Sequence, residues 1–392
     1  MSLFALTLLL IEFLDEFVFG AYETAWPLIR DDLALSYTQI GLLFTLPALF
    51  SNLVEPILGI LSDLGRRRVL ILGGGVAFAL ALVLAAASQS FFPLLFASLL
   101  LFPASGAFVS LSQAALMDTD PARHEQNMAR WTLAGSIGMV LGPLALGAAS
   151  VLGLGWRGLF VIFAGLALAL MALAARQPVV HLNGTNGDDE DTPGFRQGLR
   201  LAWQAIRRRD VLRWLVLLQF SDLMLDVLYG FLALYFVDVV GVEAGRAGLA
   251  VAVWTGVGLV GDLLMIPLLE RVRGLPYLRV SAALVLITFP AFLLAGPFAL
   301  KLALLGGLGL LNAGWYAILQ AQLYSALPGQ SGTVLAAVNV GGLFGSLVPL
   351  GLGLLAESAG LEAAMWLLLA GPVALLIGIP RRARSAPLVT EE

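Results

Sequence analysis

Acidic residues inside long apolar stretches are the most informative feature of this chain, because an ionisable group placed there is costly and by default suggests a function. In the first stretch, spacings of three, four and seven residues put most of the acids on one stripe of a helix. A carboxylate in a low-dielectric surrounding without a basic partner holds either a proton or a cation. The predicted proton- or cation-coupling residues are Glu12, Asp15, Glu16, Glu55, Asp222, Asp226 and Asp262.

The interiors of these stretches contain no basic residue, and the nearest ones, Arg130 and Lys301, lie toward their ends. This imbalance favours a carrier that takes up a proton or cation on one side of a membrane and releases it on the other. The alternative is that some of the acids are neutral and hydrogen-bond two helices together.

The chain repeats itself without a gap: Asp15 aligns with Asp222 and Glu55 with Asp262, an offset of 207 residues in both cases. The same offset matches Asp31 with Asp238, Gln113 with Gln320 and Gly138 with Gly345. A duplicated membrane protein usually binds its ligand at the interface of the two halves. We favour Asp15 and Asp222 because each lies mid-span on the first helix of its half.

Composition predicts an all-α membrane protein. Hydrophobic residues make up 59% and charged residues 12% of the chain, against about 25% charged residues in soluble domains. A bilayer core of about 30 Å needs roughly 20 apolar helical residues, and a barrel is excluded because its strands would alternate in hydrophobicity. The twelve predicted spans are 4–29, 38–62, 69–88, 92–117, 128–152, 157–176, 211–237, 245–270, 276–296, 299–326, 332–356 and 362–380.

Arg and Lys gather on one side of these spans, so the positive-inside rule places both termini in the cytoplasm. We expect the cytoplasmic (inner) membrane of a bacterium. The predicted organisation is two pseudo-symmetric six-helix halves, 1–176 and 211–380, a cytoplasmic linker 177–210 with a surface helix, and a cytoplasmic tail 381–392.

Enzymatic chemistry finds little support in the sequence. The chain has no Cys, and His124 and His181 lie in predicted loops, so no metal site is expected. The Gly-x-Gly-Asp signature of intramembrane aspartyl proteases is missed at Leu259–Asp262, and no basic, aromatic-interleaved patch suggests nucleic acid. We expect no enzyme and no cofactor, with protons or possibly Na+ as the coupling ion.

Between the second and third predicted spans, residues 59–68 read Gly-Ile-Leu-Ser-Asp-Leu-Gly-Arg-Arg-Arg. This loop resembles the signature loop of the major facilitator superfamily, although one residue is missing between Asp63 and Gly65. The six-plus-six layout and the long central loop extend the resemblance to the whole chain. It implies a monomer with the major facilitator fold, in which spans one, four, seven and ten line a central cavity. It also implies a gating loop formed by Gly59, Asp63, Gly65, Arg66 and Arg67.

Span five carries Gly138, Gly142 and Pro143, which is similar to a Gly-x-x-x-Gly-Pro pattern of exporters in the superfamily. Small residues let two helices approach closely and Pro kinks a helix, which also serves packing in an importer. The stretch 35–41 is loosely similar to bacterial drug-resistance exporters of the fosmidomycin-resistance type and assigns no substrate.

Polar and aromatic residues on the cavity-lining spans are the candidates for substrate binding. On span ten, four of them share one stripe at helical spacing; Trp and Tyr offer a flat surface to a cation. The alternative for the Trp and Tyr is ordinary packing. The candidates are Glu23, Gln113, Tyr229, Asn312, Trp315, Tyr316 and Gln320.

The sequence therefore predicts a secondary active transporter working by alternating access, most simply a proton-coupled exporter of amphipathic or cationic small molecules. A cation-coupled symporter of a neutral solute such as a sugar, or a carrier of lipid or lysolipid, are the open alternatives. The expected partners are a small-molecule substrate and the lipid bilayer.

Overall fold

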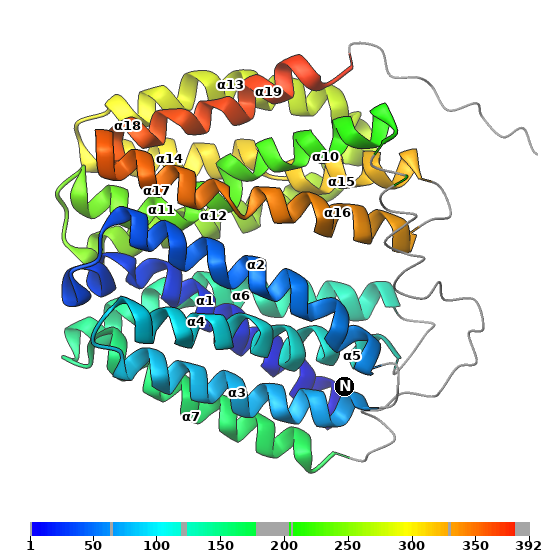
Figure 1. The fold of residues 1–392 in the computed structure, drawn as a ribbon. Helices are drawn as coiled ribbons and strands as arrows, with labels where there is room; N and C mark the ends of the chain where they lie inside the picture. The colour runs from blue at the N-terminus through cyan, green and yellow to red at the C-terminus, as the bar shows by residue number, and fades with distance from the viewer. Residues whose placement is uncertain are drawn as a thin grey trace, which may run out of the picture.

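The computed structural model describes residues 2–62, 66–118, 124–177, 204, 207–327 and 331–380, which contain helices and no strand (Figure 1). The predicted all-α class is confirmed. Before the linker the helices are α1 (Leu3–Leu33), α2 (Tyr37–Leu61), α3 (Arg67–Ala87), α4 (Phe91–Ser105), α5 (Leu111–Asp118), α6 (His124–Val151) and α7 (Gly155–Ala175). After it they are α10 (Arg209–Asp222), α11 (Leu228–Asp238), α12 (Ala244–Arg271), α13 (Gly274–Leu294), α14 (Phe298–Asn312), α15 (Trp315–Ala326), α16 (Ser331–Gly345), α17 (Val348–Ala359), α18 (Leu361–Trp366) and α19 (Ala370–Gly378).

Among the described residues, eleven helical segments are long and apolar enough to cross a membrane, and they correspond to predicted spans two to twelve. The first predicted span, α1, is 31 residues long. It is not among the eleven because each of its 18-residue stretches contains at least three ionisable residues. The acids of α1 must therefore be shielded from lipid by neighbouring helices.

The helices before the linker pack together on one side of the molecule and those after it on the other (Figure 1). The two sides meet where α2 packs on α17, α6 on α12 and α1 on α11. By contrast, α5 packs on α1, α3 and α6, and α15 packs on α10, α13 and α16, each within its own side. We call the end of the molecule at the α1–α2 turn the Arg30 end and the opposite one the Arg67 end.

The contact between α1 and α6 depends on glycine. A Cβ atom at Gly138 would lie 2.4 Å from the backbone oxygen of Phe13, and one at Gly142 would lie 2.4 Å from the backbone nitrogen of Ala21. Larger residues at these positions would push the helices apart. The adjacent Pro143 lies inside α6.

Three spans change their winding near their middle. Spans four and seven contain π-helical turns, at Gly106–Ser110 and Leu223–Val227. Span ten breaks between α14 and α15, where Gly314 has a φ of 72°. Irregular backbone at membrane depth is tolerated only where protein or a water-filled cavity satisfies it, and π-helical turns are frequent at functional sites.

Part of the predicted gating loop, Asp63 and Gly65, lies outside the described residues, as do most of the linker and the whole tail. Gly59 lies in α2, and Arg66 is exposed just before α3. The Nε of Arg67 donates to the Oγ of Ser62 at 3.0 Å. The gating role of this loop and the domain boundaries stay predictions.

Candidate functional site

Acids of α1 and of span seven face each other across the interface between the halves. Glu16 and Glu23 lie within electrostatic range of Asp226, and the carboxyl groups of Asp222 and Asp226, four residues apart on span seven, are close enough to interact. Two neighbouring carboxyl groups can share a proton, because like charges close together repel each other. We call Asp222 and Asp226 the acid pair, and the pair with Glu16 and Glu23 the acid cluster.

The acid pair is not fully buried. Asp222 is half-buried and Asp226 is exposed, although both lie in the middle of span seven. Tyr316 on α15 is 48% exposed and lies within electrostatic range of both Asp222 and Asp226. Because Asp226 faces acids of the other half, its exposure indicates open space between the halves.

Asp15 belongs to a different environment. Its side chain is 7% exposed, and the Oγ of Ser105 donates to its two carboxylate oxygens at 2.9 and 3.0 Å. Ser105 directly precedes the π-helical turn of span four, whose first residue, Gly106, packs against the side chain of Glu55. The matched residues Asp15 and Asp222 therefore make different contacts, one with span four and one within span seven.

Glu12 is also buried, against α6. A Cβ atom at Gly135 would lie 2.5 Å from the Oε1 of Glu12 and 3.1 Å from the Cγ of Glu16. The glycine row of α6 thus provides the room that two acids of α1 occupy.

Glu23 and Tyr229 line the same interface. The Oε2 of Glu23 accepts a hydrogen bond from the Nε1 of Trp26 at 3.1 Å. The hydroxyl of Tyr229 donates to the Sδ of Met139 on α6 at 3.0 Å, so Tyr229 reaches from one half to the other.

The break at Gly314 interrupts the predicted stripe on span ten, which assumed one continuous helix, and the substrate-binding role of its residues stays a prediction. Asn312 is buried and its Nδ2 donates to the backbone oxygen of Met224 at 3.1 Å. Trp315 is 0% exposed, and its Nε1 donates to the Oγ of Ser281 at 2.8 Å. Both are packed within the second half. Of the other candidates, Tyr316 is exposed on α15, and Gln320 on α15 and Gln113 on α5 are partly buried.

Asp262 contacts the same break between α14 and α15. Its Oδ1 accepts a hydrogen bond from the backbone N–H of Gly314 at 3.0 Å. On the other side of the break, the hydroxyl of Tyr277 lies 3.1 Å from the backbone oxygen of Ala313. The surroundings of Asp262 are thus those of a helix cap.

Three basic residues of the first and second halves have partners away from the acid cluster. Arg30 forms ion pairs with Asp31 and Asp238, and Arg157 forms one with Asp32. The Nζ of Lys301 donates to the hydroxyl of Tyr235 and to the backbone oxygens of Phe292 and Leu293, at the end of α13. The described residues also contain no cluster of three or more side chains able to hold a metal ion. The negative charge of the cluster is therefore not balanced by a described basic side chain.

The family model of the Major Facilitator Superfamily matches residues 8–349. The chain belongs to this superfamily. It is a transporter and an integral membrane protein, not an enzyme, and the predicted major facilitator fold is confirmed.

Solved structures of superfamily transporters share this fold. A bacterial homologue of the human lysosomal transporter Spinster, in an inward-facing and unoccupied conformation, is 20% identical with a TM-score of 0.73, over 96% of this chain and 95% of that one. The nucleoside transporter NupG is 14% identical with a TM-score of 0.76, over 97% and 98%. No curated protein sequence matches the chain.

This superfamily member has a polar connection between its halves that the sequence did not reveal. Asp238 on α11 accepts hydrogen bonds from Arg30 on α1 and from the hydroxyl of Tyr37. The Oε2 of Glu357 on α17 accepts from the backbone N–H groups of Tyr37 and Thr38, at the start of α2, at 2.8 and 3.4 Å. We call Arg30, Tyr37, Asp238 and Glu357 the latch. The repeat matched Asp31 with Asp238, but no sequence signal indicated these partners.

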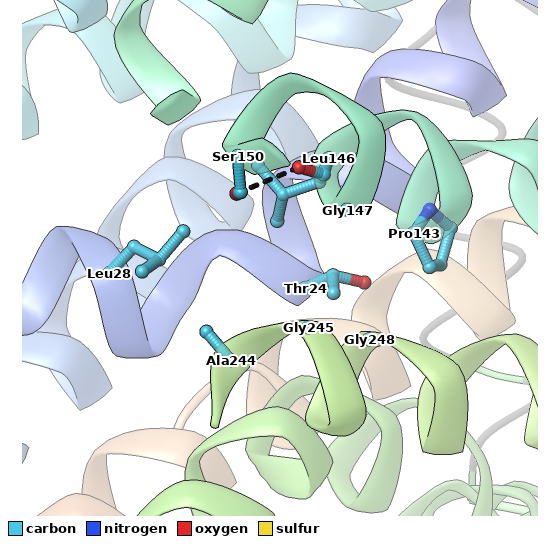
Figure 2. A pocket seen from close by; sticks show the side chains of 9 residues that line it. All are labelled: Thr24, Leu28, Pro143, Leu146, Gly147, Ser150, Ala244, Gly245 and Gly248. Carbon is cyan, nitrogen blue, oxygen red and sulfur yellow. Dashed lines mark hydrogen bonds between the residues drawn. The ribbon is translucent and has the colours of Figure 1, made fainter. Parts of the chain in front are cut away.

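A small pocket lies where α1, α6 and α12 meet, near the Arg30 end (Figure 2). Its accessible volume of about 10 Å³ is no larger than one water molecule requires. The hydroxyl of Ser150 in its wall donates to the backbone oxygen of Leu146 (Figure 2). The pocket is a packing gap between the halves, too small for a substrate.

Proposed function

We propose that this transporter exports cationic or amphipathic small molecules in exchange for protons. The observation that carries the proposal is the acid pair. Asp222 and Asp226 lie close together, Asp226 is exposed and faces Glu16 and Glu23 of the other half, and no described basic side chain neutralises the pair.

Proton and cargo would compete for this negative charge. Asp222 and Asp226 hold the exchangeable proton, while Glu16 and Glu23 attract the cation, and Tyr229 and Tyr316 offer aromatic surface to it. A cation 4 Å from a carboxylate gains about 4 kcal/mol at an effective dielectric constant of 20. An interaction of that size is enough for cargo binding to drive proton release, and for protonation to drive cargo release.

Exchange across the membrane requires the halves to rock about this site. In the described conformation the halves meet through the latch, while the main contacts of α5 and α15 lie within their own halves. The positive-inside rule would put the Arg67 end in the cytoplasm, so this conformation would open inward. The inward-facing state of the Spinster homologue supports the same orientation. We expect the bacterial inner membrane as the location.

Purified protein in liposomes with a pH-sensitive dye inside tests the proposal. Tetraphenylphosphonium serves as the cation, uridine as the neutral solute because NupG shares the fold, and a lysolipid below its micellar concentration as the zwitterion. Antiport predicts that the added cation makes the lumen more alkaline, only with protein present. Lumenal acidification by uridine alone would replace the exporter with a symporter.

Two variants sharpen this test. Asp222→Asn should lose the proton movement. Asp210→Asn changes an exposed acid at the start of α10, on the same span, and should behave like the wild type. Equal loss in both variants would contradict a specific role for the acid pair.

A further inference from the structure

The break in span ten leaves backbone groups without helical partners in the middle of the membrane. A helix end has unpaired N–H or C=O groups, and lipid offers them no hydrogen bonds. Gly314 adopts a φ of 72°, and a Cβ atom there would lie 3.0 Å from the Cε of Met265. The position therefore needs glycine, and the break is a fixed feature of the fold.

Side chains from two neighbouring helices form hydrogen bonds with the unpaired backbone groups at the break. Asp262 of α12 accepts from the Gly314 N–H, at the positive end of the α15 dipole. Tyr277 of α13 points its hydroxyl at the carbonyl end of α14, 3.1 Å from the Ala313 oxygen. A Cβ atom at Gly261 would lie 2.7 Å from the Cβ of Ala313, so glycine beside Asp262 lets α12 come close enough.

The break also connects to the acid pair. Asn312, the last residue of α14, donates to the backbone oxygen of Met224, within the π-helical turn that contains Asp226. Tyr316, the second residue of α15, lies within electrostatic range of Asp222 and Asp226. The position of the first turn of α15 therefore sets where the Tyr316 hydroxyl lies relative to the acid pair.

We propose that Asp262 is a positioning residue, which holds the start of α15 through the Gly314 N–H and thereby places Tyr316 beside the acid cluster. This proposal rests on the proposed function, because it assumes that the acid cluster takes part in transport. It replaces the coupling role that the sequence suggested for Asp262. The required property is then a hydrogen-bond acceptor, which Asn also provides, and not an exchangeable proton.

The chain has no cysteine, so two introduced cysteines carry spin labels without background. Val280 on α13 and Ser325 on α15 are both exposed, and pulsed EPR measures the distance between labels there. We expect one narrow distribution in the wild type and in Asp262→Asn, and a broader or displaced one in Asp262→Ala. Tyr277→Phe, which removes only the hydroxyl, should broaden the distance distribution as well. This variant replaces Asp262→Ala in the test if Asp262→Ala does not fold.

Cation-driven proton movement in liposomes gives the second readout. Asp262→Ala should lower it by about tenfold, which corresponds to about 1.4 kcal/mol, the size of one lost hydrogen bond, and Asp262→Asn, which keeps an acceptor, should retain it. The proposal would be overturned if the distances were unchanged in both Asp262→Ala and Tyr277→Phe, or if Asp262→Asn broadened them as much as Asp262→Ala. It would also be overturned if Asp262→Asn kept the wild-type distances but lost proton movement. If the wild type moves no protons, the exporter fails but the distances still decide the role of Asp262.

Discussion

The carboxylate of Asp238 binds the guanidinium of Arg30 and so ties the first helix of one half to the first span of the other. The two side chains are only 15% and 18% exposed. A partly buried ion pair is screened less by water than an exposed one, so removing one partner costs more there than at the surface. This contact therefore stabilises closure of the Arg30 end.

Asp238→Asn should shift the transporter toward the state that is open at the Arg30 end. We expect a shift of tenfold or more, which corresponds to about 1.4 kcal/mol. Thr24 reports on this end, because it is buried between the halves beside Gly248 and Pro143. The labelling rate of a Thr24→Cys variant with a membrane-impermeant maleimide should rise accordingly.

Asp31→Asn is the matched control for the latch. Asp31 contacts the same Arg30, but its side chain is 63% exposed, and exposed pairs contribute little. Labelling should stay within about twofold of the wild type. A similar rise in both variants would mean that general charge, and not the latch, sets the equilibrium.

The spans and the mid-membrane acids were predictable from the sequence. Each span needs about 20 apolar residues, so the boundaries follow from hydropathy; predicted span 245–270 is α12, Ala244–Arg271. Acids such as Asp226 are rare within apolar stretches, so they are easily recognised as candidate functional residues. The repeat directed attention to spans one and seven, whose acids Glu16 and Asp226 lie within electrostatic range of each other.

Contacts between distant segments and breaks in regular winding were not predictable. Glu357 and Tyr37 are 320 residues apart, and only the packing of α17 on α2 brings them together. The stripe on span ten assumed an uninterrupted helical period. Gly314 ends that period, but it is one of 43 glycines, so its presence alone signals little.

Glu357 stabilises the start of α2 by accepting from backbone N–H groups that have no helical partner. Glu357→Gln keeps an acceptor oxygen and loses the charge, which is worth about 0.3–1 kcal/mol at a helix N-terminus. Glu357→Ala loses both. Thr24→Cys labelling should rise by less than tenfold in the first variant and by more in the second. Equal rates in the two variants would show that the hydrogen bonds do not matter.

Gly142→Ala should destabilise the protein. The added methyl group would lie 2.4 Å from the Ala21 nitrogen, and overpacking of this kind costs about 1–3 kcal/mol. Gly147→Ala on the same helix meets nothing within 4 Å and should stabilise it by up to about 1 kcal/mol, because Ala is the better helix former. Thermal unfolding in detergent measures both. A melting temperature unchanged by Gly142→Ala would contradict the tight α1–α6 contact.

Asp222→Asn should abolish coupled transport while leaving the fold intact. Asn has the shape of Asp and can still hydrogen-bond to Asp226, but it can neither take up nor release a proton. We expect at least a tenfold loss of cation-driven proton movement, with a melting temperature close to that of the wild type. Exchange of labelled cation for unlabelled cation, which moves no net proton, should persist and would show that the variant still binds and rocks. Wild-type proton movement in Asp222→Asn would remove this residue from the mechanism and leave Asp226, with Glu16 and Glu23, to carry the proton.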